Sequence, residues 1–176
     1  HRPEEHLMYF LDITEQMELE KLYEEEKTVI AIIYLDNYDE LTQGMDDQAR
    51  SNINSLVISI LNDWAQKNGI YMKRFSSDRF VAVFNERILQ TLEKNKFAIL
   101  DDVREITAKK NLPLTLSIGV GSGVTALPEL GALAQSSLDL ALGRGGDQVA
   151  IKHASGKVKF YGGKTNPVEK RTRVRA

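Results

Sequence analysis

The sequence predicts an α+β (α/β) domain in which helices flank one mixed central sheet. Three observations support this prediction: strand-like and helix-like stretches alternate along the chain, one early strand is apolar on both faces, and a short polar segment joins two later strands. With 176 residues the chain is long enough to bury a core of its own, as one domain with short appendages. Its composition, 42% hydrophobic and 27% charged, is typical of a globular domain.

The first strong elements are a strand at residues 28–35 and a long helix at residues 46–68. The strand reads TVIAIIYL, and such a continuous β-branched run is typical of a central strand that is covered on both faces. In the helix, apolar side chains recur every three or four positions, which is the spacing of one buried helical face. Asn68 and Gly69 supply the helix stop.

A hairpin and three more strands complete the predicted sheet, together with two further helical stretches. The hairpin joins strands at residues 70–75 and 79–84 through Ser76-Ser77-Asp78, which is a short polar connection. A helical stretch at residues 87–110 follows, with a break near Asn95. The remaining elements are a strand at residues 114–120 with alternating apolar side chains, a helix from Pro128 to Gly143, and strands at residues 148–152 and 157–161.

The two ends of the chain show little apolar pattern. Residues 15–26 hold six Glu and one Lys, which fits either a solvated helix or a signalling helix that joins an upstream domain. Residues 162–176 hold five basic side chains and one acidic side chain, and we interpret them as a solvated linker. The chain begins at His1 without an initiator Met, so we expect it to be a piece of a longer protein.

The composition excludes several classes of function. With 23 basic and 25 acidic side chains the formal charge is −2, so no overall field attracts nucleic acid. The absence of cysteine excludes disulfides and thiolate metal sites, and three scattered histidines are too few for a histidine-built metal site. The longest apolar run, residues 29–35, is too short to span a membrane, and no signal peptide opens the chain.

Three segments together resemble the diguanylate cyclase (GGDEF) domain family. Arg74-Phe75-Ser76-Ser77-Asp78-Arg79-Phe80 resembles the R-x-G-G-D-E-F hairpin of that family. Tyr34-Leu35-Asp36-Asn37-Tyr38 resembles the D-x-D-x-F at the end of its first strand, and Ser117-Ile118-Gly119-Val120 matches its S-I-G-V strand. The order of elements also agrees, so the resemblance implies a nucleotidyl-cyclase-like fold with an N-terminal linker helix.

The positions that carry cyclase chemistry in that family are changed in this sequence. The first metal-binding Asp of the family falls on Tyr34, the Glu after the retained Asp78 falls on Arg79, and a phosphate-binding Lys falls on Asp39. The R-x-x-D feedback site is absent at residues 67–70. Phosphoryl transfer of this kind needs carboxylates that hold two cations over a triphosphate. The resemblance therefore implies a cyclase fold without cyclase activity.

Four segments together resemble the degenerate GGDEF domain of the membrane-bound cyclic di-AMP phosphodiesterases of the GdpP type. They are SSDRF at residues 76–80, YLDNYDE at residues 34–40, LGRGGDQVA at residues 142–150, and DITE at residues 12–15, which is similar to the close of a PAS domain. The resemblance implies that residues 1–26 end a PAS domain and form a linker helix, that residues 27–161 form the degenerate domain, and that residues 162–176 lead toward a DHH/DHHA1 domain. It implies a cytoplasmic domain of a membrane-anchored bacterial protein, which is a homodimer. Hydrolysis of cyclic di-AMP to pApA would occur in the DHH/DHHA1 domain, outside this chain.

The resemblance also implies a weak nucleotide site at the hairpin. Asp78 would be the main ligand of Mg²⁺ or Mn²⁺ arriving with ATP, and Asp36 its helper, because Asp36 shares a strand face with position 34. The implied nucleotide-binding residues are Ser76, Ser77 and Arg79 in the hairpin, and Thr42 and Ser51 at the positions that read guanine in the family. Thr42 and Ser51 lack the bidentate groups that select guanine, so we expect little preference for GTP over ATP.

The sequence supports two hypotheses about the function. In the first, the domain is a regulatory module that binds nucleotide and hydrolyses ATP weakly, with Asp78 as the candidate catalytic residue. In the second, it is a ligand-free spacer that dimerises and relays a signal between the PAS and DHH domains. The segment GRGGD at residues 143–147 favours a helix stop with a tight turn over a phosphate-binding loop, because it follows a helix and precedes a strand.

Overall fold

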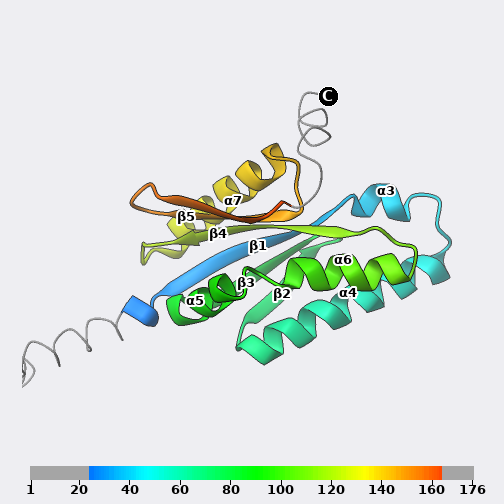
Figure 1. Cartoon of the computed structure of the whole chain (residues 1–176), viewed down its shortest axis with the longest axis horizontal. Helices are drawn as coiled ribbons and strands as arrows, with labels where there is room; N and C mark the ends of the chain where they lie inside the picture. Colours follow the sequence, from blue (N-terminus) through cyan, green and yellow to red (C-terminus); the bar gives the residue numbers. More distant parts are fainter. Residues whose placement is uncertain (1–23, 164–176) are drawn as a thin grey trace, which may run out of the picture.

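The computed structural model describes residues 24–163 and shows a single six-stranded sheet (Figure 1). The strands are β1 (Thr28–Asp36), β2 (Tyr71–Ser76), β3 (Arg79–Asn85), β4 (Thr115–Ser122), β5 (Gln148–His153) and β6 (Val158–Gly162). They lie in the order β2-β3-β1-β4-β5-β6, and all neighbouring pairs are antiparallel except β4 and β5. The mixed sheet predicted from the sequence is therefore confirmed.

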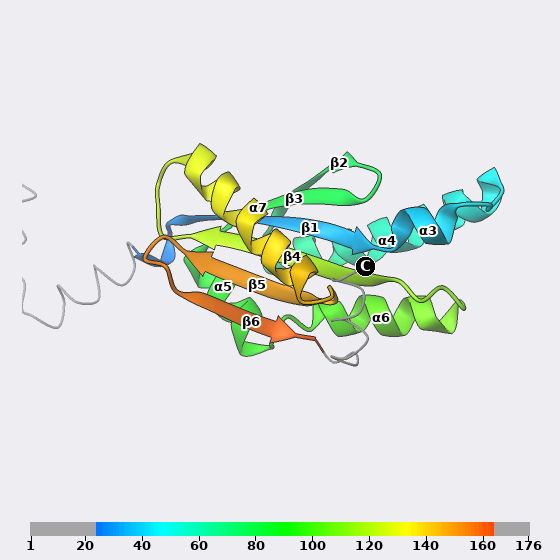
Figure 2. The ribbon, with the colours of Figure 1, turned by 90° about the horizontal axis from the view of Figure 1, so that it is seen from above.

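Helices cover the two faces of the sheet unequally. The helices are α3 (Tyr38–Thr42), α4 (Asp47–Asn68), α5 (Glu86–Lys94), α6 (Ile99–Lys109) and α7 (Leu127–Gly143). Helices α4, α5 and α6 lie on one face, whereas α7 crosses the other face over β1, β4 and β5 (Figure 1, Figure 2). Helix α7 connects β4 to β5, which is why these two strands run parallel.

Most predicted elements are confirmed within a residue or two. The Asp46 carboxylate caps α4 by accepting from the N–H of Ala49 at 2.7 Å, and Gly69 ends the helix at a φ of 72°. The predicted break near Asn95 separates α5 from α6. Helix α3 was not predicted. Strand β4 is buried on both faces, because α7 covers the face that points away from α4, α5 and α6.

The alternation of side chains along β1 divides the core into two clusters. Val29, Ala31, Ile33 and Leu35 belong to the larger cluster under α4, α5 and α6. Ile30 and Ile32 belong to the smaller cluster under α7, with Tyr34 packed against it. Since side-chain direction repeats every two residues, Asp36 continues the face of Tyr34. Both functional positions of β1 therefore point to the α7 side of the sheet.

Helix α7 sits directly on the backbone of β4. A Cβ atom at Gly119 would lie 2.2 Å from the backbone nitrogen of Leu138, and one at Gly121 would lie 2.4 Å from the carbonyl oxygen of Leu130. No side chain fits at either position without displacing the helix. This contact fixes the turn that follows α7, and that turn contributes to the site described below.

Some sequence expectations lie outside the described residues. These are the PAS end, most of the linker helix, and the basic segment after Gly163. Within residues 24–163, no helix is both long and apolar enough to cross a membrane.

Candidate functional site

The hairpin turn lies beside the end of the central strand β1. Tyr34 lies opposite Arg79 in the register of β1 and β3, and the N–H of Leu35 donates to the carbonyl oxygen of Asp78 at 2.8 Å. The structure therefore gathers the four predicted hairpin positions next to the end of β1, and these are Ser76, Ser77, Asp78 and Arg79.

The turn presents one carboxylate and two hydroxyl groups. Ser76 and Ser77 are exposed, and Asp78 is half-buried. The Ser76 hydroxyl donates to Oδ1 of Asp78 at 3.0 Å. Serine in place of glycine adds hydroxyl donors to the turn, and it restricts the close approach of a phosphate to the backbone.

Arg74 anchors the turn to the helices beneath it. Its Nε donates to the carbonyl oxygen of Ser76 at 3.1 Å, and its Nη2 also donates to the carbonyl oxygen of Ser77. The same Nη2 donates to Oδ1 of Asn54 on α4 at 3.1 Å. The guanidinium lies 5.9 Å from the ring centre of Tyr38 and 5.5 Å from that of Phe80. These contacts fix the position of the turn relative to β1.

Replacement of Arg74 by alanine is expected to lower the free energy of unfolding by about 1–3 kcal/mol, because several hydrogen bonds and two ring contacts are lost together. Denaturant unfolding measures this change. The neighbouring Lys73 is exposed and supplies a matched control, and Lys73→Ala is expected to change the stability by less than about 0.5 kcal/mol. Equal losses in the two variants would contradict the anchoring role.

Tyr34 and Arg79 fill the positions where the cyclase resemblance places two carboxylates. The Arg79 guanidinium lies 5.5 Å from the centre of the Tyr34 ring. Burial raises the pKa of Tyr34, and the nearby carboxylates of Asp78 and Asp36 raise it further. Tyr34 is therefore a neutral side chain beside a fixed cation.

Asp36 is 8% exposed, and its carboxylate accepts hydrogen bonds from other groups of the protein. It accepts from Thr115 Oγ1 at 2.7 Å, from Ser117 Oγ at 2.8 Å and from the N–H of Asp147 at 3.0 Å. Burial raises its pKa to about 6, against the opposing effect of these hydrogen bonds. A Cβ atom at Gly146 would lie 3.1 Å from Asp36 Oδ2, so the turn after α7 closes tightly over the carboxylate.

A buried ion pair holds that turn from the other side. Arg104 on α6 donates to Asp147 through Nε at 3.0 Å and through Nη2 at 2.7 Å, and its Nη1 donates to Asp101 at 2.6 Å. Asp147 raises the pKa of Arg104, mainly through these hydrogen bonds. Arg144, also in this turn, donates to Gln148 at 2.8 Å and stacks on Phe160. Asp36 and Asp147 therefore join β1, α6 and the α7–β5 turn.

The two positions expected to face a base lie on α3 and α4. Thr42 is 6% exposed, and its hydroxyl donates to the carbonyl oxygen of Tyr38 at 2.8 Å, so it serves the short helix α3. Ser51 is exposed on α4, one helical turn before Asn54. Of the two, only Ser51 presents its hydroxyl to solvent.

The side chains at this end of β1 do not supply the ligands of the two-metal centre of a cyclase. Position 34 carries no carboxylate, Asp36 is already bonded, and Arg79 adds a positive charge that repels cations. Among residues 24–163, no group of three His, Asp or Glu side chains is placed to hold a metal ion. Of the two predicted metal ligands, Asp36 and Asp78, only Asp78 is partly exposed.

Three residues of this region were not among the predicted site residues. Arg74 entered only as part of the hairpin motif, and no sequence pattern indicated Asn54 or Arg104. Arg104 lies 43 residues before Asp147, and no spacing in the sequence connects the two. Arg74 had a signal of its own, because it lies in a predicted strand next to the aromatic Phe75, and a guanidinium is attracted to the face of an aromatic ring.

Comparisons with known proteins agree with the resemblance. Residues 33–160 match the family described as cyclic-di-AMP phosphodiesterase GdpP-like, GGDEF domain. The chain is 72% identical over 172 residues to cyclic-di-AMP phosphodiesterase GdpP of Geobacillus thermodenitrificans, covering 98% of this chain and 26% of that protein. It is 68% identical over 173 residues to the Bacillus subtilis protein of the same description, with the same coverage. The chain thus spans about a quarter of the length of these relatives.

A solved structure supports the fold independently of sequence. The GGDEF domain of DgcB from Caulobacter crescentus, solved with c-di-GMP, superposes with a TM-score of 0.56. The sequences are 15% identical, and the superposition covers 78% of this chain and 84% of the other. The fold is therefore that of GGDEF domains.

Proposed function

Because the chain belongs to the GdpP-like GGDEF family, we propose that it is the regulatory, non-cyclase module of a cyclic di-AMP phosphodiesterase. One observation carries the proposal, namely that the guanidinium of Arg79 lies over the Tyr34 ring at 5.5 Å. This pair stands where a cyclase would hold cations over a triphosphate. In the longer protein, hydrolysis of cyclic di-AMP belongs to another domain.

The module also binds a nucleotide weakly at the hairpin. The exposed Ser76 and Ser77 hydroxyls and the Arg79 guanidinium are donors for phosphate oxygens. Asp78 is the one carboxylate of the turn, and it would contact a divalent ion that enters with the nucleotide. The burial of Thr42 removes one of the two expected base contacts, which supports binding without selection of guanine.

Titration of the chain with ATP and with GTP, each with Mg²⁺, tests this binding. We expect both nucleotides to shift the amide resonances of residues 76–79, with affinities that differ by less than about tenfold. Asp78→Asn keeps the side-chain shape and removes the charge, so it should weaken Mg²⁺-dependent binding by about 10-fold or more. Asp63→Asn on the exposed surface of α4 is the matched control.

Several results would contradict nucleotide binding at the hairpin. One is the absence of any shift at residues 76–79. Another is an Asp78→Asn variant that binds ATP as the wild type does. A preference for GTP of tenfold or more would contradict the loss of base selection.

A second candidate function is a ligand-free relay between neighbouring domains. It is favoured by the contact between the entering segment and α5. The N–H of Glu86 donates to the carbonyl oxygen of Lys27 at 3.0 Å, and Arg87 pairs with Glu26 at 3.5 Å. A displacement of the entering segment would thus reach α5 and the sheet. If ATP binds nowhere and deletion of this domain still changes phosphodiesterase activity of the full-length homodimer, the relay is the function.

A further inference from the structure

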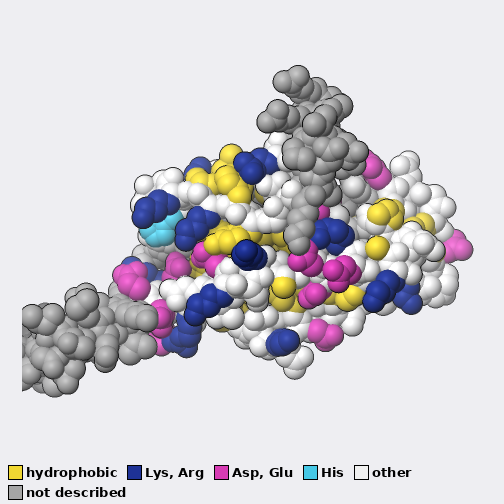
Figure 3. Space-filling view, in the orientation of Figure 1, with side chains coloured by type: hydrophobic (Ala, Val, Ile, Leu, Met, Phe, Trp, Pro, Cys, Tyr) yellow, Lys and Arg dark blue, Asp and Glu magenta, His cyan; other side chains and the backbone are white. Residues whose placement is uncertain are grey.

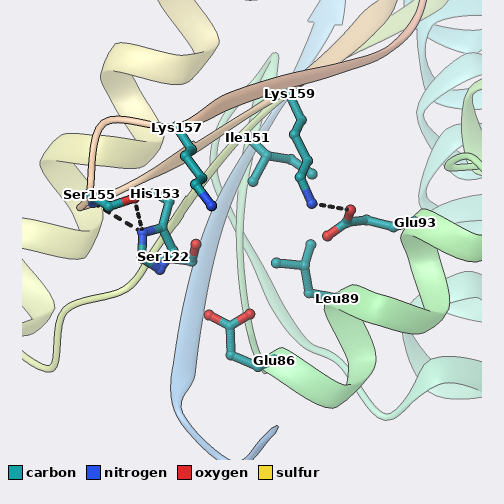
Figure 4. A pocket seen from close by; sticks show the side chains of 9 residues that line it. All are labelled: Glu86, Leu89, Glu93, Ser122, Ile151, His153, Ser155, Lys157 and Lys159. Carbon is teal, nitrogen blue, oxygen red and sulfur yellow. Dashed lines mark hydrogen bonds and ion pairs between the residues drawn. The ribbon is translucent and has the colours of Figure 1, made fainter. Parts of the chain in front are cut away.

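A polar cavity lies at the end of the sheet remote from the hairpin (Figure 4). Its volume is about 200 Å³, and it opens between the start of α5 and the turn that joins β5 to β6. Leu89 and Ile151 form an apolar floor. None of the hairpin positions lines this cavity, so it is separate from the proposed nucleotide site.

The charges on its walls are segregated. Glu86 and Glu93 project from α5, whereas Lys157 and Lys159 point into the cavity from the opposite wall (Figure 4). Lys159 pairs with Glu93 at 3.2 Å. The space-filling view shows basic side chains beside the histidine at this end, with acidic side chains on the adjoining surface (Figure 3). One wall is thus acidic and the other is basic.

Two of these charges are not neutralised by direct contacts. Within residues 24–163, no hydrogen bond or ion pair joins the side chain of Glu86 or that of Lys157 to another side chain. Burial raises the pKa of Glu86, and the nearby carboxylates of Glu93 and Glu24 raise it further, against the smaller opposing effect of Lys27 and Lys159. A positive group that reached Glu86 would stabilise its ionised form.

The basic wall is held in place by local contacts. His153 Nδ1 accepts from the N–H of Ser155 at 3.0 Å, which closes the β5–β6 turn. A Cβ atom at Gly123, whose φ is 93°, would lie 2.6 Å from Nε2 of the same ring. The imidazole therefore packs directly on the Gly123 backbone. This contact holds the β5–β6 turn, which precedes Lys157, in a fixed position.

We propose that this cavity binds a small aliphatic zwitterion, of the size of a free amino acid. The carboxylate of the ligand pairs with Lys157, its ammonium group pairs with Glu86, and its methylene groups lie on the apolar floor. A simple anion would face the two glutamates, and a simple cation would face the two lysines, so only a ligand with both charges is complementary to both walls. The cavity volume of about 200 Å³ lies below the roughly 300–1,000 Å³ of pockets that take drug-sized ligands, which favours a ligand of few heavy atoms.

A ligand in this cavity would lie close to Lys27, where the chain enters the domain just before β1. The backbone of Glu86 is bonded to that of Lys27, as described above. The ligand therefore sits where the segment from upstream meets α5, at the opposite end of β1 from the hairpin.

Titration of the isotopically labelled 176-residue chain with glycine, β-alanine and 4-aminobutyrate tests the proposal. These three probes differ in the separation of their charges. We expect at least one of them to shift the amide resonances of Glu86, Ser122 and Lys157. Butyrate and propylamine carry one charge each, and we expect them to bind at least about 10-fold more weakly, because one wall then stays unpaired.

Matched variants show whether a probe binds through charge pairing with Glu86 and Lys157 or binds nonspecifically. Glu86→Gln and Lys157→Gln should each weaken binding of the best probe by about 10-fold or more. Lys152→Gln is the control, since Lys152 bonds to Ser136 on α7, on the other face of the sheet. The proposal is overturned if no zwitterion shifts these resonances up to about 50 mM, well above a Kd of ~1 mM. It is also overturned if butyrate or propylamine binds equally well, or if both Gln variants bind as the wild type does.

Discussion

Replacement of Arg104 by alanine is expected to lower the free energy of unfolding by about 3–5 kcal/mol. Arg104 gives Asp147 two hydrogen bonds, and the Asp147 side chain is only 4% exposed. The substitution leaves a buried carboxylate without its opposite charge, at the turn that closes over Asp36. Denaturant unfolding of the variant at neutral pH measures the loss.

Two comparisons show whether the buried charge is the cause. Arg87 also forms ion pairs, but its side chain is 52% exposed, so Arg87→Ala should cost less than about 1 kcal/mol. In the double variant Arg104→Ala with Asp147→Asn, removal of the carboxylate should restore part of the stability. An Arg104→Ala variant that unfolds at the wild-type denaturant concentration would contradict the role of this pair.

Asp36 is expected to make the stability of the domain depend on pH between about 4 and 6. Burial raises its pKa to about 6, from 3.8 for an unperturbed carboxyl group. As the pH falls through 6, the folded state takes up a proton before the unfolded state does, so the contribution of Asp36 becomes more stabilising. As the pH rises above 6, both states are ionised and the folded state bears the cost of a buried charge. The difference amounts to about 3 kcal/mol.

The Asp36→Asn variant tests this dependence, because asparagine keeps the shape of the side chain and does not titrate. The stability of the wild type relative to the variant should be greater at pH 4.5 than at pH 7.5, by about 2 kcal/mol. Asp63→Asn, at an exposed position on α4, is the control and should show no such change. If the two pH profiles of wild type and Asp36→Asn run parallel, Asp36 does not titrate in this range.

The elements of the fold could be predicted because their signals are local. The apolar run of β1 and the Asp46 and Gly69 ends of α4 are properties of neighbouring residues. Helix α3 escaped prediction because its five residues are too few to show a period. The burial of β4 on both faces could not be predicted, because it depends on α7, whose close approach at Gly119 and Gly121 is not visible in any local pattern.

The candidate site could be predicted only in part. The motif predicted that the hairpin lies beside the end of β1, and the pairing of Tyr34 with Arg79 in the β1–β3 register confirms this position. The sequence also suggested Asp36 as a helper ligand, since it shares a face with position 34. It could not show that Thr115 and Ser117, brought alongside by the β1–β4 register, occupy its oxygens. Hydrogen-bond partners from distant strands become known only with the fold.

Incubation of the chain with GTP and Mg²⁺, followed by mass-spectrometric measurement of cyclic di-GMP, is the most direct test of a GGDEF domain without cyclase activity. We expect no product above a protein-free control. We expect the same for Arg79→Glu, because Tyr34 still supplies no carboxylate. Formation of cyclic di-GMP by the wild-type chain, and its loss in Asp78→Asn, would show that the site retains cyclase chemistry and would contradict the proposed function.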